Sequence, residues 1–252
     1  MSIDIIITQN PHYDSAMAFV ENITAKVDGV FSWTIEAFGG FATAHFEMVV
    51  PEADAWEMLN RLGKRVAFLS PDAPDKSLVC WEGMIHTVNI DDGGATIARS
   101  LENCYNRIRV NYTPVDTNHT PPIVNSIFGT DDNTDATSAA LYGKREMRYI
   151  HGEIPGTSSA IRLAKAGQMR DLFLSQFANP RASTTTMRRG GGSSASSLRV
   201  AVDCVGFAHE LAYKFHEETS NSTVTLDAIL TAIITNTTYG NIPGTATPID
   251  GE

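Results

Sequence analysis

The sequence predicts an α+β fold dominated by β-strands, in two β-sandwich or barrel units that each carry a flanking helix. Three observations lead to this prediction. Most of the chain alternates large apolar residues with small or polar ones, which is the pattern of strands with one covered face. Helical spacing is confined to residues 51–63, 155–178 and 225–234. The length of 252 residues exceeds the commonest domain size of about 100–150 residues.

A change of composition near the middle of the chain sets the predicted boundary between the two units. Residues 114–140 are rich in Thr, Asn, Asp and Pro and have neither helical nor strand periodicity, which is typical of a long loop or domain junction. We therefore expect a first β unit at residues 1–113 and a second, with the long helix, at residues 141–235. The tail from 236 to 252 is expected to be irregular.

The first half contains two hairpin signals and one short helix. Residues 39–40 and 91–94 are Gly-containing turns between alternating segments, and Gly tolerates the positive φ that such turns require. Pro and acidic residues occupy the first turn of the predicted helix at residues 51–63, and Gly63 marks its end. This helix is expected to lie on a sheet, with Trp56 in the core.

The second half contains the longest predicted helix. It opens at residues 155–159 and ends at Asn179-Pro180, because the residue before a proline avoids the helical conformation. Residues 187–194 are predicted to form a flexible hairpin tip, and residues 198–207 alternate as a strand. Thr225 is the predicted cap of a last short helix.

Composition indicates a folded protein that does not grip nucleic acid. Hydrophobic residues make up 42% and charged residues 19% of the chain, unlike the composition of a disordered protein. The formal net charge of −10 argues against DNA binding, because Lys and Arg must replace the counterions condensed on the phosphates. No apolar run approaches the roughly 18 residues of a membrane helix, and the N-terminus does not resemble a signal peptide. We expect a soluble chain made in a cytoplasm, without a membrane anchor.

Cysteine and histidine residues form no metal-binding pattern in the sequence. Cys80, Cys104 and Cys204 are widely spaced and are predicted to be buried free thiols. Residues 209–213 resemble the zinc-protease motif, in which two His one helical turn apart bind the metal, but Tyr213 occupies the second His position. We therefore expect no metal and no other cofactor.

No acid, base and nucleophile form a matched set, so the chain is not expected to be an enzyme. His151 and Glu153 bring an imidazole near a carboxylate, with Glu146 close by in the sequence. On a strand these residues are expected to lie at the surface or in a subunit contact. The glycine run that ends at Ser194 lacks the Lys of a phosphate-binding loop and precedes a strand, where that loop needs a helix.

Several segments follow one another in a distinctive order. Residues 100–113 contain an Asn-Arg pair before an alternating run that ends in Tyr-Thr, and residues 141–146 contain Tyr-Gly-x-Arg-Glu. An Ala- and Leu-rich helix follows at 160–181, then a strand with Cys-x-Gly-aromatic at 198–207 and a helical segment at 226–230. In this order the segments resemble the central hub proteins of bacteriophage tail tips and baseplates, a family related to the tail-tube fold.

The resemblance implies two tail-tube-like β units in each chain and a homotrimer that presents six such units to a six-fold tail tube. The implied partners are the tail tube or distal tail protein, the tape measure protein and the tip or fibre proteins. The implied role is that of an adaptor and channel in the virion tail, made in the host bacterial cytoplasm. Members of the family often extend further than this chain, so the resemblance also implies a short hub or the front of a longer one.

The acidic balance of the chain suits a channel through which DNA passes without binding. Carboxylates on the lumen would repel phosphates over a Debye length of about 8 Å at physiological ionic strength. Asp91, Asp92 and Glu102 are the candidates for lumen-facing acids.

Two other functions stay open from the sequence alone. A peripheral phage tail module that binds host cell-wall glycan would cluster exposed aromatic residues, such as Tyr105, Tyr112 and Tyr149, around a groove. Trp33, Trp56 and Trp81 offer similar aromatic faces, but they fall in periodic segments that favour core packing.

The other alternative is a hydrolase that acts on peptidoglycan during entry. It would need Glu153 or His209 in a catalytic role, and the sequence offers neither of them a matched partner.

Overall fold

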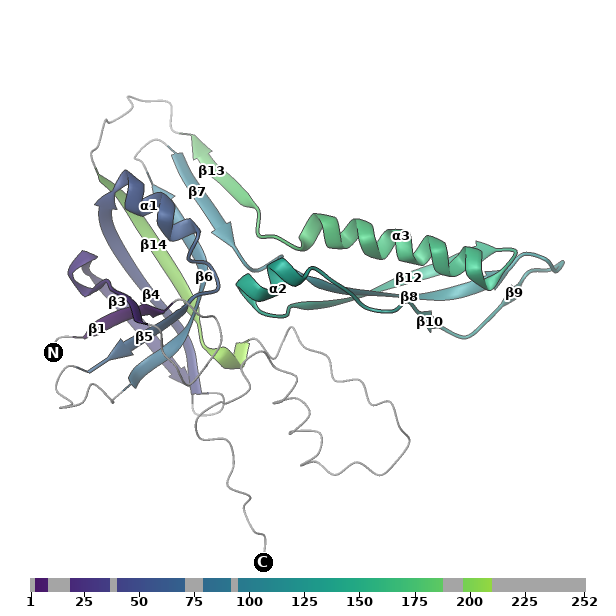
Figure 1. The fold of residues 1–252 in the computed structure, drawn as a ribbon, viewed down its shortest axis with the longest axis horizontal. Coiled ribbons are helices and arrows are strands. Elements are labelled where there is room, and N and C mark those ends of the chain that lie inside the picture. Colours follow the sequence, from purple (N-terminus) through teal and green to yellow (C-terminus); the bar gives the residue numbers. More distant parts are fainter. Residues whose placement is uncertain are drawn as a thin grey trace, which may run out of the picture. The chain divides into compact units, whose positions relative to one another are not determined.

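The computed structural model of the chain describes residues 3–8, 19–36, 40–70, 79–91, 95–187 and 197–209. Contacts between Cα atoms divide it into two compact units. Unit 1 comprises residues 1–102 and 181–252, and unit 2 comprises residues 103–180. Strands dominate both units and helices are few, so the predicted β-dominated α+β class is confirmed (Figure 1).

The described residues of unit 1 contain a nine-stranded antiparallel sheet, helix α1 and the 3-10 turn η1, and a further 3-10 turn at residues 207–209. Its elements are β1 (Asp4–Thr8), β2 (Phe19–Asn22), η1 (Thr24–Lys26), β3 (Val27–Glu36), β4 (Gly40–Pro51), α1 (Glu52–Leu59), β5 (Arg65–Leu69), β6 (Val79–Asp91), β7 (Ala95–Ser100), β13 (Ala182–Met187) and β14 (Ser197–Val205). The strand order is β2-β1-β5-β6-β14-β4-β3, and β7 and β13 branch from β6. β6 is long enough to pair with β5 along its first half and with β7 along its second.

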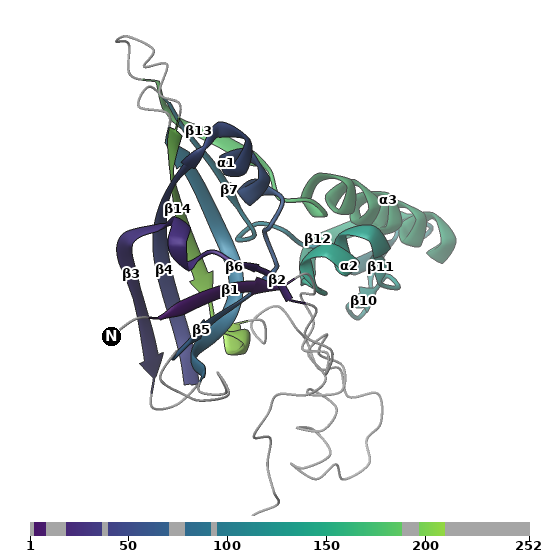
Figure 2. The same ribbon diagram turned by 60° about the vertical axis from the view of Figure 1, so that its left-hand side comes forward.

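The sheet of unit 1 is curled (Figure 2). Aromatic and branched side chains fill the core that it encloses. Phe68 on β5 lies with its ring centroid 6.3 Å from that of Phe46 on β4 and 5.8 Å from that of Trp33 on β3. β5 is a neighbour of neither strand in the sheet, so the branch that carries β5 must fold over the others. Burying a side chain of this size contributes about 1.5–3 kcal/mol, and the curl is therefore held by the hydrophobic effect.

Helix α1 packs against β4, β6 and β14, and it begins and ends inside the predicted range. Ala55 and Met58 are its buried residues. The prediction that Trp56 lies in the core is wrong, because this side chain is 40% exposed and its indole donates a 3.1 Å hydrogen bond to Glu52 Oε1. A helix turns by 100° per residue, which places Trp56 beside the buried stripe rather than on it.

The last two described strands of the chain belong to the sheet of unit 1. β14 pairs with β4 and β6, and β13 pairs with β7, so the units are not consecutive halves at 1–113 and 141–235. Alternation identifies a strand but not its partner, which is why the sequence did not reveal this arrangement. β13 and β14 are not neighbours and form no hairpin with each other. Of the predicted tip, Met187 is the last residue of β13, and residues 188–194 lie outside the described residues. The predicted helix at 225–234 and the tail at 236–252 also lie outside them.

Unit 2 is an insertion between β7 and β13, which pair as the two arms of a hairpin. Its elements are β8 (Arg107–Asp116), β9 (Ile123–Val124), β10 (Phe128–Gly129), β11 (Asn133–Thr134), α2 (Ala136–Tyr142), β12 (Glu146–Gly156) and α3 (Ser159–Phe177). β8 pairs in parallel with β12 on one side and antiparallel with the three short strands on the other. Residues 114–140, predicted as a loop, therefore contain the end of β8, three short strands and most of α2.

The core of unit 2 is small and lies between the sheet and α3. Val110, Tyr112, Ile154 and Ala166 are buried there. The helix begins where the sequence predicts, with the Ser158 hydroxyl as its cap, and it ends before the predicted Asn-Pro stop. Unit 2 is thus a sheet covered on one face by a helix, and not a second sandwich or barrel as predicted. Among the residues that the structure describes, no helix is long and apolar enough to cross a membrane.

Candidate functional surface

The face of the unit 1 sheet that points away from the core carries rows of polar side chains. In β4 and β14 every second residue is buried, and the residues between them form the other face. Residues paired across antiparallel strands share a face, so the register links them into rows. The first row is Ser32, His45, Asp203, Thr87 and Ser100, on β3, β4, β14, β6 and β7 in turn.

Two further rows complete this surface, which we call the polar face. The second row is Glu47, Ala201, Asn89 and Ala98, and the third is Val49, Arg199, Asp91 and Thr96. Val49 is the one large apolar residue in the three rows. A broad sheet face composed of small and charged residues is suited to contact with water or solutes rather than to burial in a core.

Charged side chains of the polar face contact one another along β4 and β14. His45 Nδ1 lies 2.7 Å from Asp203 Oδ1, and His45 Nε2 lies 3.6 Å from Glu47 Oε1. Arg199 Nη1 lies 3.3 Å from Glu47 Oε2. All of these groups are partly exposed, so each pair contributes at most about 1 kcal/mol. The three rows together contain three carboxylates, one guanidinium and one imidazole, from Glu47, Asp91, Asp203, Arg199 and His45.

The first row contains the residue types of a serine hydrolase triad without its geometry. A triad needs the histidine to accept a hydrogen bond from the serine hydroxyl through one ring nitrogen while the other faces the acid. In this row His45 faces Asp203 with Nδ1, but its Nε2 faces Glu47 rather than Ser32. This arrangement does not activate a nucleophile.

The other sequence candidates for catalysis are not drawn together either. His151 and Glu153 lie on β12 of unit 2, whereas His209 belongs to unit 1, where its ring lies edge-on to His86 with centroids 5.4 Å apart. Within the described ranges no group of three or more His, Cys, Asp or Glu residues is arranged to hold a metal ion.

A shallow hollow of about 210 Å³ opens at one end of the polar face. Ser32, Thr43, His45 and Asp203 line it from the polar face, whereas Trp33 belongs to the alternate residues and packs in the core against Phe68. Hydroxyl, imidazole and carboxylate groups together can form hydrogen bonds with a sugar.

The three predicted lumen acids have different positions. Asp91 is exposed at the end of β6 and belongs to the third row of the polar face. Glu102 is exposed just beyond β7, at the opposite end of the β6-β7 hairpin from Asp91, so the structure does not bring the two together. Asp92 lies outside the described residues. The acids Glu47 and Asp203 of the polar face were not singled out from the sequence, although their alternation with buried residues was visible.

The tyrosines expected around a glycan groove do not form one. Tyr112 is buried in the core of unit 2, and Tyr149 packs against Phe173 with ring centroids 4.7 Å apart. Tyr105 contacts Phe177 instead, with centroids 6.5 Å apart. These rings therefore serve packing within unit 2.

The two motifs that carry the family resemblance in unit 2 meet in one buried polar cluster. Asn106 donates a 2.7 Å hydrogen bond to the Gly143 carbonyl and accepts one of 2.9 Å from the Arg145 backbone N–H. Arg145 is fully buried, and its Nε donates to the Cys104 carbonyl at 3.0 Å. The side chain of Asn106 thus provides hydrogen-bond partners for two buried backbone groups of the segment that contains Gly143 and Arg145. The Asn-Arg and Tyr-Gly-x-Arg-Glu segments therefore have a structural reason to occur together.

The same cluster fastens the point where the chain enters and leaves unit 2. Cys104 Sγ donates to the Ala178 carbonyl at 3.3 Å, and the Ser138 hydroxyl donates to that carbonyl as well. Next to it, Arg107 bridges two carboxylates, Glu146 and Asp132, each at 2.6 Å. Unit 2 is therefore closed at its base by its own residues.

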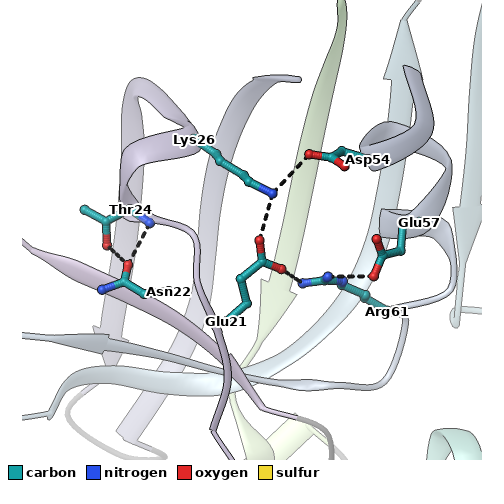
Figure 3. Close-up of polar contacts among 7 residues, drawn as sticks. All are labelled: Glu21, Asn22, Thr24, Lys26, Asp54, Glu57 and Arg61. Carbon is teal, nitrogen blue, oxygen red and sulfur yellow. Dashed lines mark hydrogen bonds and ion pairs between the residues drawn. The ribbon is translucent and has the colours of Figure 1, made fainter. Parts of the chain in front are cut away.

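In unit 1, a second polar cluster joins β2 and η1 to α1 (Figure 3). Lys26 Nζ lies 2.7 Å from Glu21 and 3.0 Å from Asp54, and Arg61 lies 2.6 Å from Glu21 and 2.8 Å from Glu57. The hydrogen bond from Lys26, together with Arg61, lowers the pKa of Glu21. The gap beside it has a volume of about 10 Å³, enough for one water molecule, and the cluster joins these elements to one another.

One ion pair lies inside unit 1. Arg65 on β5 contacts Glu82 on β6, and both side chains are almost fully buried. Burial raises the pKa of Glu82, and Arg65 only partly opposes this shift. The pair therefore holds charge where its desolvation is costly.

The cysteines are free, as predicted, with Cys104 and Cys204 buried and Cys80 partly buried. Burial, with the neighbouring charge of Asp203 as a second cause, raises the pKa of the Cys204 thiol well above its usual range. Such a thiol is unreactive at neutral pH.

Comparisons with protein-family models, curated proteins and solved structures give no match for this chain.

Proposed function

We propose that the chain is a structural protein of a phage tail tip or baseplate, a hub that joins the tail tube to distal tip proteins. Three copies form a ring, and the polar face of unit 1 lines the channel for DNA. Its neighbours are the tail tube or distal tail protein, the tape measure protein and the tip or fibre proteins. The polar face carries this proposal, because a broad sheet surface without aromatic anchors suits a wall along which a polymer slides.

The free edges of the sheet support assembly into a ring. In the described part of the chain β3 and β13 each have one neighbouring strand, and they lie at opposite ends of the row β3-β4-β14-β6-β7-β13. A sheet with two open edges can continue into the sheets of neighbouring copies, and closure of the ring removes edges that would otherwise invite aggregation.

The distribution of charge supports a channel that repels DNA. Unit 2 contains 8 of the 19 Lys and Arg residues and 7 of the 29 Asp and Glu residues. Unit 1 therefore contains 11 basic and 22 acidic residues. The acidic excess therefore belongs to the unit that carries the polar face. Asp91, Asp203 and Glu47 are the carboxylates that would face the phosphates.

A glycan-binding tail module is the second candidate, supported by the hollow that Ser32, His45 and Asp203 line. If it binds a sugar, titration with a chitin oligosaccharide should give a binding isotherm in calorimetry. Binding should disappear in Asp203→Ala and persist in Glu102→Ala, whose carboxylate is exposed but lies outside the hollow.

The hub is tested by the solution mass from light scattering, together with negative-stain images of the purified chain. We expect three times the 27.3 kDa of one chain and a ring with an open centre. A monomer in solution that also fails to form rings when concentrated would contradict the proposal.

A further inference from the structure

We propose that two copies of the chain pair with each other through the open edge of β12 in unit 2. Among the described strands β12 has one neighbour, β8, and its other edge faces no strand. It is 11 residues long, and an open edge of this length is a template for a second strand. The residues of β12 show which strand fits it.

A bulge in β12 places Arg148 and Glu153 on the same face of the sheet. In the register with β8, Arg148 pairs with Arg109 and Glu153 pairs with Thr113. Arg109 and Thr113 are four residues apart on β8, so their side chains lie on the same face of the sheet. Ile150 lies between Arg148 and Glu153, and the two residues after it together occupy one position of the register. Without the extra residue, positions five apart would lie on opposite faces.

Arg148 and Glu153 are consequently equivalent positions on either side of Ile150. A second β12, antiparallel and related by a two-fold axis at Ile150, sets Arg148 opposite Glu153 of the partner copy, and the symmetry creates this pair twice. Opposite charges directly across two antiparallel strands are stabilising, whereas like charges are destabilising. The edge of β12 is therefore complementary to itself.

The same register also places apolar side chains opposite apolar side chains. Ile150 lies opposite its own copy, and at 73% exposure it is the most exposed large apolar side chain of the described residues. On the face covered by α3, Met147 comes opposite Ile154, again an apolar pair. One register thus satisfies both faces of the strand, which favours a second copy over an unrelated segment.

This pairing uses unit 2 alone and does not depend on the ring proposed for unit 1. A disulfide tests its register, because directly opposite residues of antiparallel strands have Cα atoms about 4.5–5.5 Å apart, within the range of a disulfide. In the full-length chain with Cys80 replaced by Ser, Ile150→Cys should form a covalent dimer under mild oxidation. Ile127→Cys is the matched control, since Ile127 is 69% exposed in the same unit but lies off β12, and it should not cross-link at the same concentration.

A charge exchange tests the predicted contacts in the same assay. Arg148→Glu in the Ile150→Cys background should slow dimer formation at least tenfold, because like charges then meet across the axis. Adding Glu153→Arg should restore the rate. Equal cross-linking at positions 150 and 127, or no rescue by the exchange, would overturn the pairing. Light scattering of the Arg148→Glu chain reports separately on the ring, so cross-linking without a ring refutes only the hub, and a ring without cross-linking refutes only the pairing.

Discussion

Unit 1 and unit 2 bury their apolar side chains in different ways. Unit 1 curls nine strands around a core that includes Phe46, Phe68 and Trp81. Unit 2 covers one face of a small sheet with α3, and it carries nine of the thirteen exposed large apolar side chains of the described residues. We therefore expect unit 1 to fold on its own, and we propose that the exposed apolar side chains of unit 2 contact partners.

Excision of unit 2 is the largest change that tests whether unit 1 folds on its own. Replacing residues 103–180 by Asn-Gly should leave β7 and β13 as an ordinary hairpin, because Arg99 and Ala182 are already paired. We expect a shortened chain that unfolds cooperatively and keeps the near-ultraviolet circular dichroism of buried Trp81. Loss of that signal would show that unit 1 needs unit 2 to fold.

Within unit 1, the buried pair Arg65–Glu82 should have the next largest effect. Arg65→Met should cost about 3–5 kcal/mol of unfolding free energy, because it leaves the buried carboxylate of Glu82 without its counter-charge. Adding Glu82→Leu should recover most of the loss, and urea unfolding measures both variants. If the double variant is as unstable as the single one, the pair contributes more than its desolvation costs.

The raised pKa of Glu82 also predicts a pH dependence. Its carboxyl ionises in the unfolded chain near 4.5 and only at higher pH in the folded chain. The group therefore contributes stability below pH 4.5 that is lost as the pH rises through the folded pKa. Glu82→Gln should remove this component from a plot of unfolding free energy against pH.

In unit 2 the corresponding test is the polar cluster around Asn106. Asn106→Ala leaves the Gly143 carbonyl and the Arg145 N–H without their side-chain partner, which costs about 1–3 kcal/mol for each buried group. Hydrogen exchange should show faster opening of β8 and β12 with unit 1 unchanged. Asn133→Ala is the control, because its bond to Asp171 is exposed and its loss should change stability by less than about 0.5 kcal/mol.

The ion pairs of Lys26 should have the smallest effect. Lys26→Met removes two exposed contacts and should cost about 0.5–1 kcal/mol at low salt and less at high salt. The pKa of Glu21 is lowered in the folded chain, so its contribution is present above the unfolded value of 4.5 and is lost as the pH falls through the folded pKa. A salt-independent loss would mean that packing of the lysine stem, and not charge, is responsible.

The sequence predicts individual elements of this chain better than their partners. The start of α3 and the pairing of β6 with β7 on either side of residues 92–94 follow local signals, and both occur where predicted. The place of β14 between β4 and β6 depends on pairing over about 150 residues, which no local pattern encodes. The pattern does not predict the exposure of Trp56, because neighbouring residues such as Ala55 and Trp56 differ by only 100° around the helix axis.

The candidate surface was predictable only in part. Asp91 was visible as an acid beside a hairpin turn, and the structure places it on the polar face. His45 and Asp203 are 158 residues apart in sequence, and only the register of β4 with β14 brings them together. The cluster at Asn106 is easier to predict, because both of its segments contain recognisable motifs, Asn-Arg and Tyr-Gly-x-Arg-Glu.

We propose that the polar face of unit 1 lines a channel. A cryo-electron microscopy map of the assembled chain would show which face of β4, β14 and β6 borders the open centre. We expect a ring in which Asp91, Ala201 and His45 face the lumen. A ring whose lumen is bordered by unit 2, or by a predominantly basic surface, would contradict it.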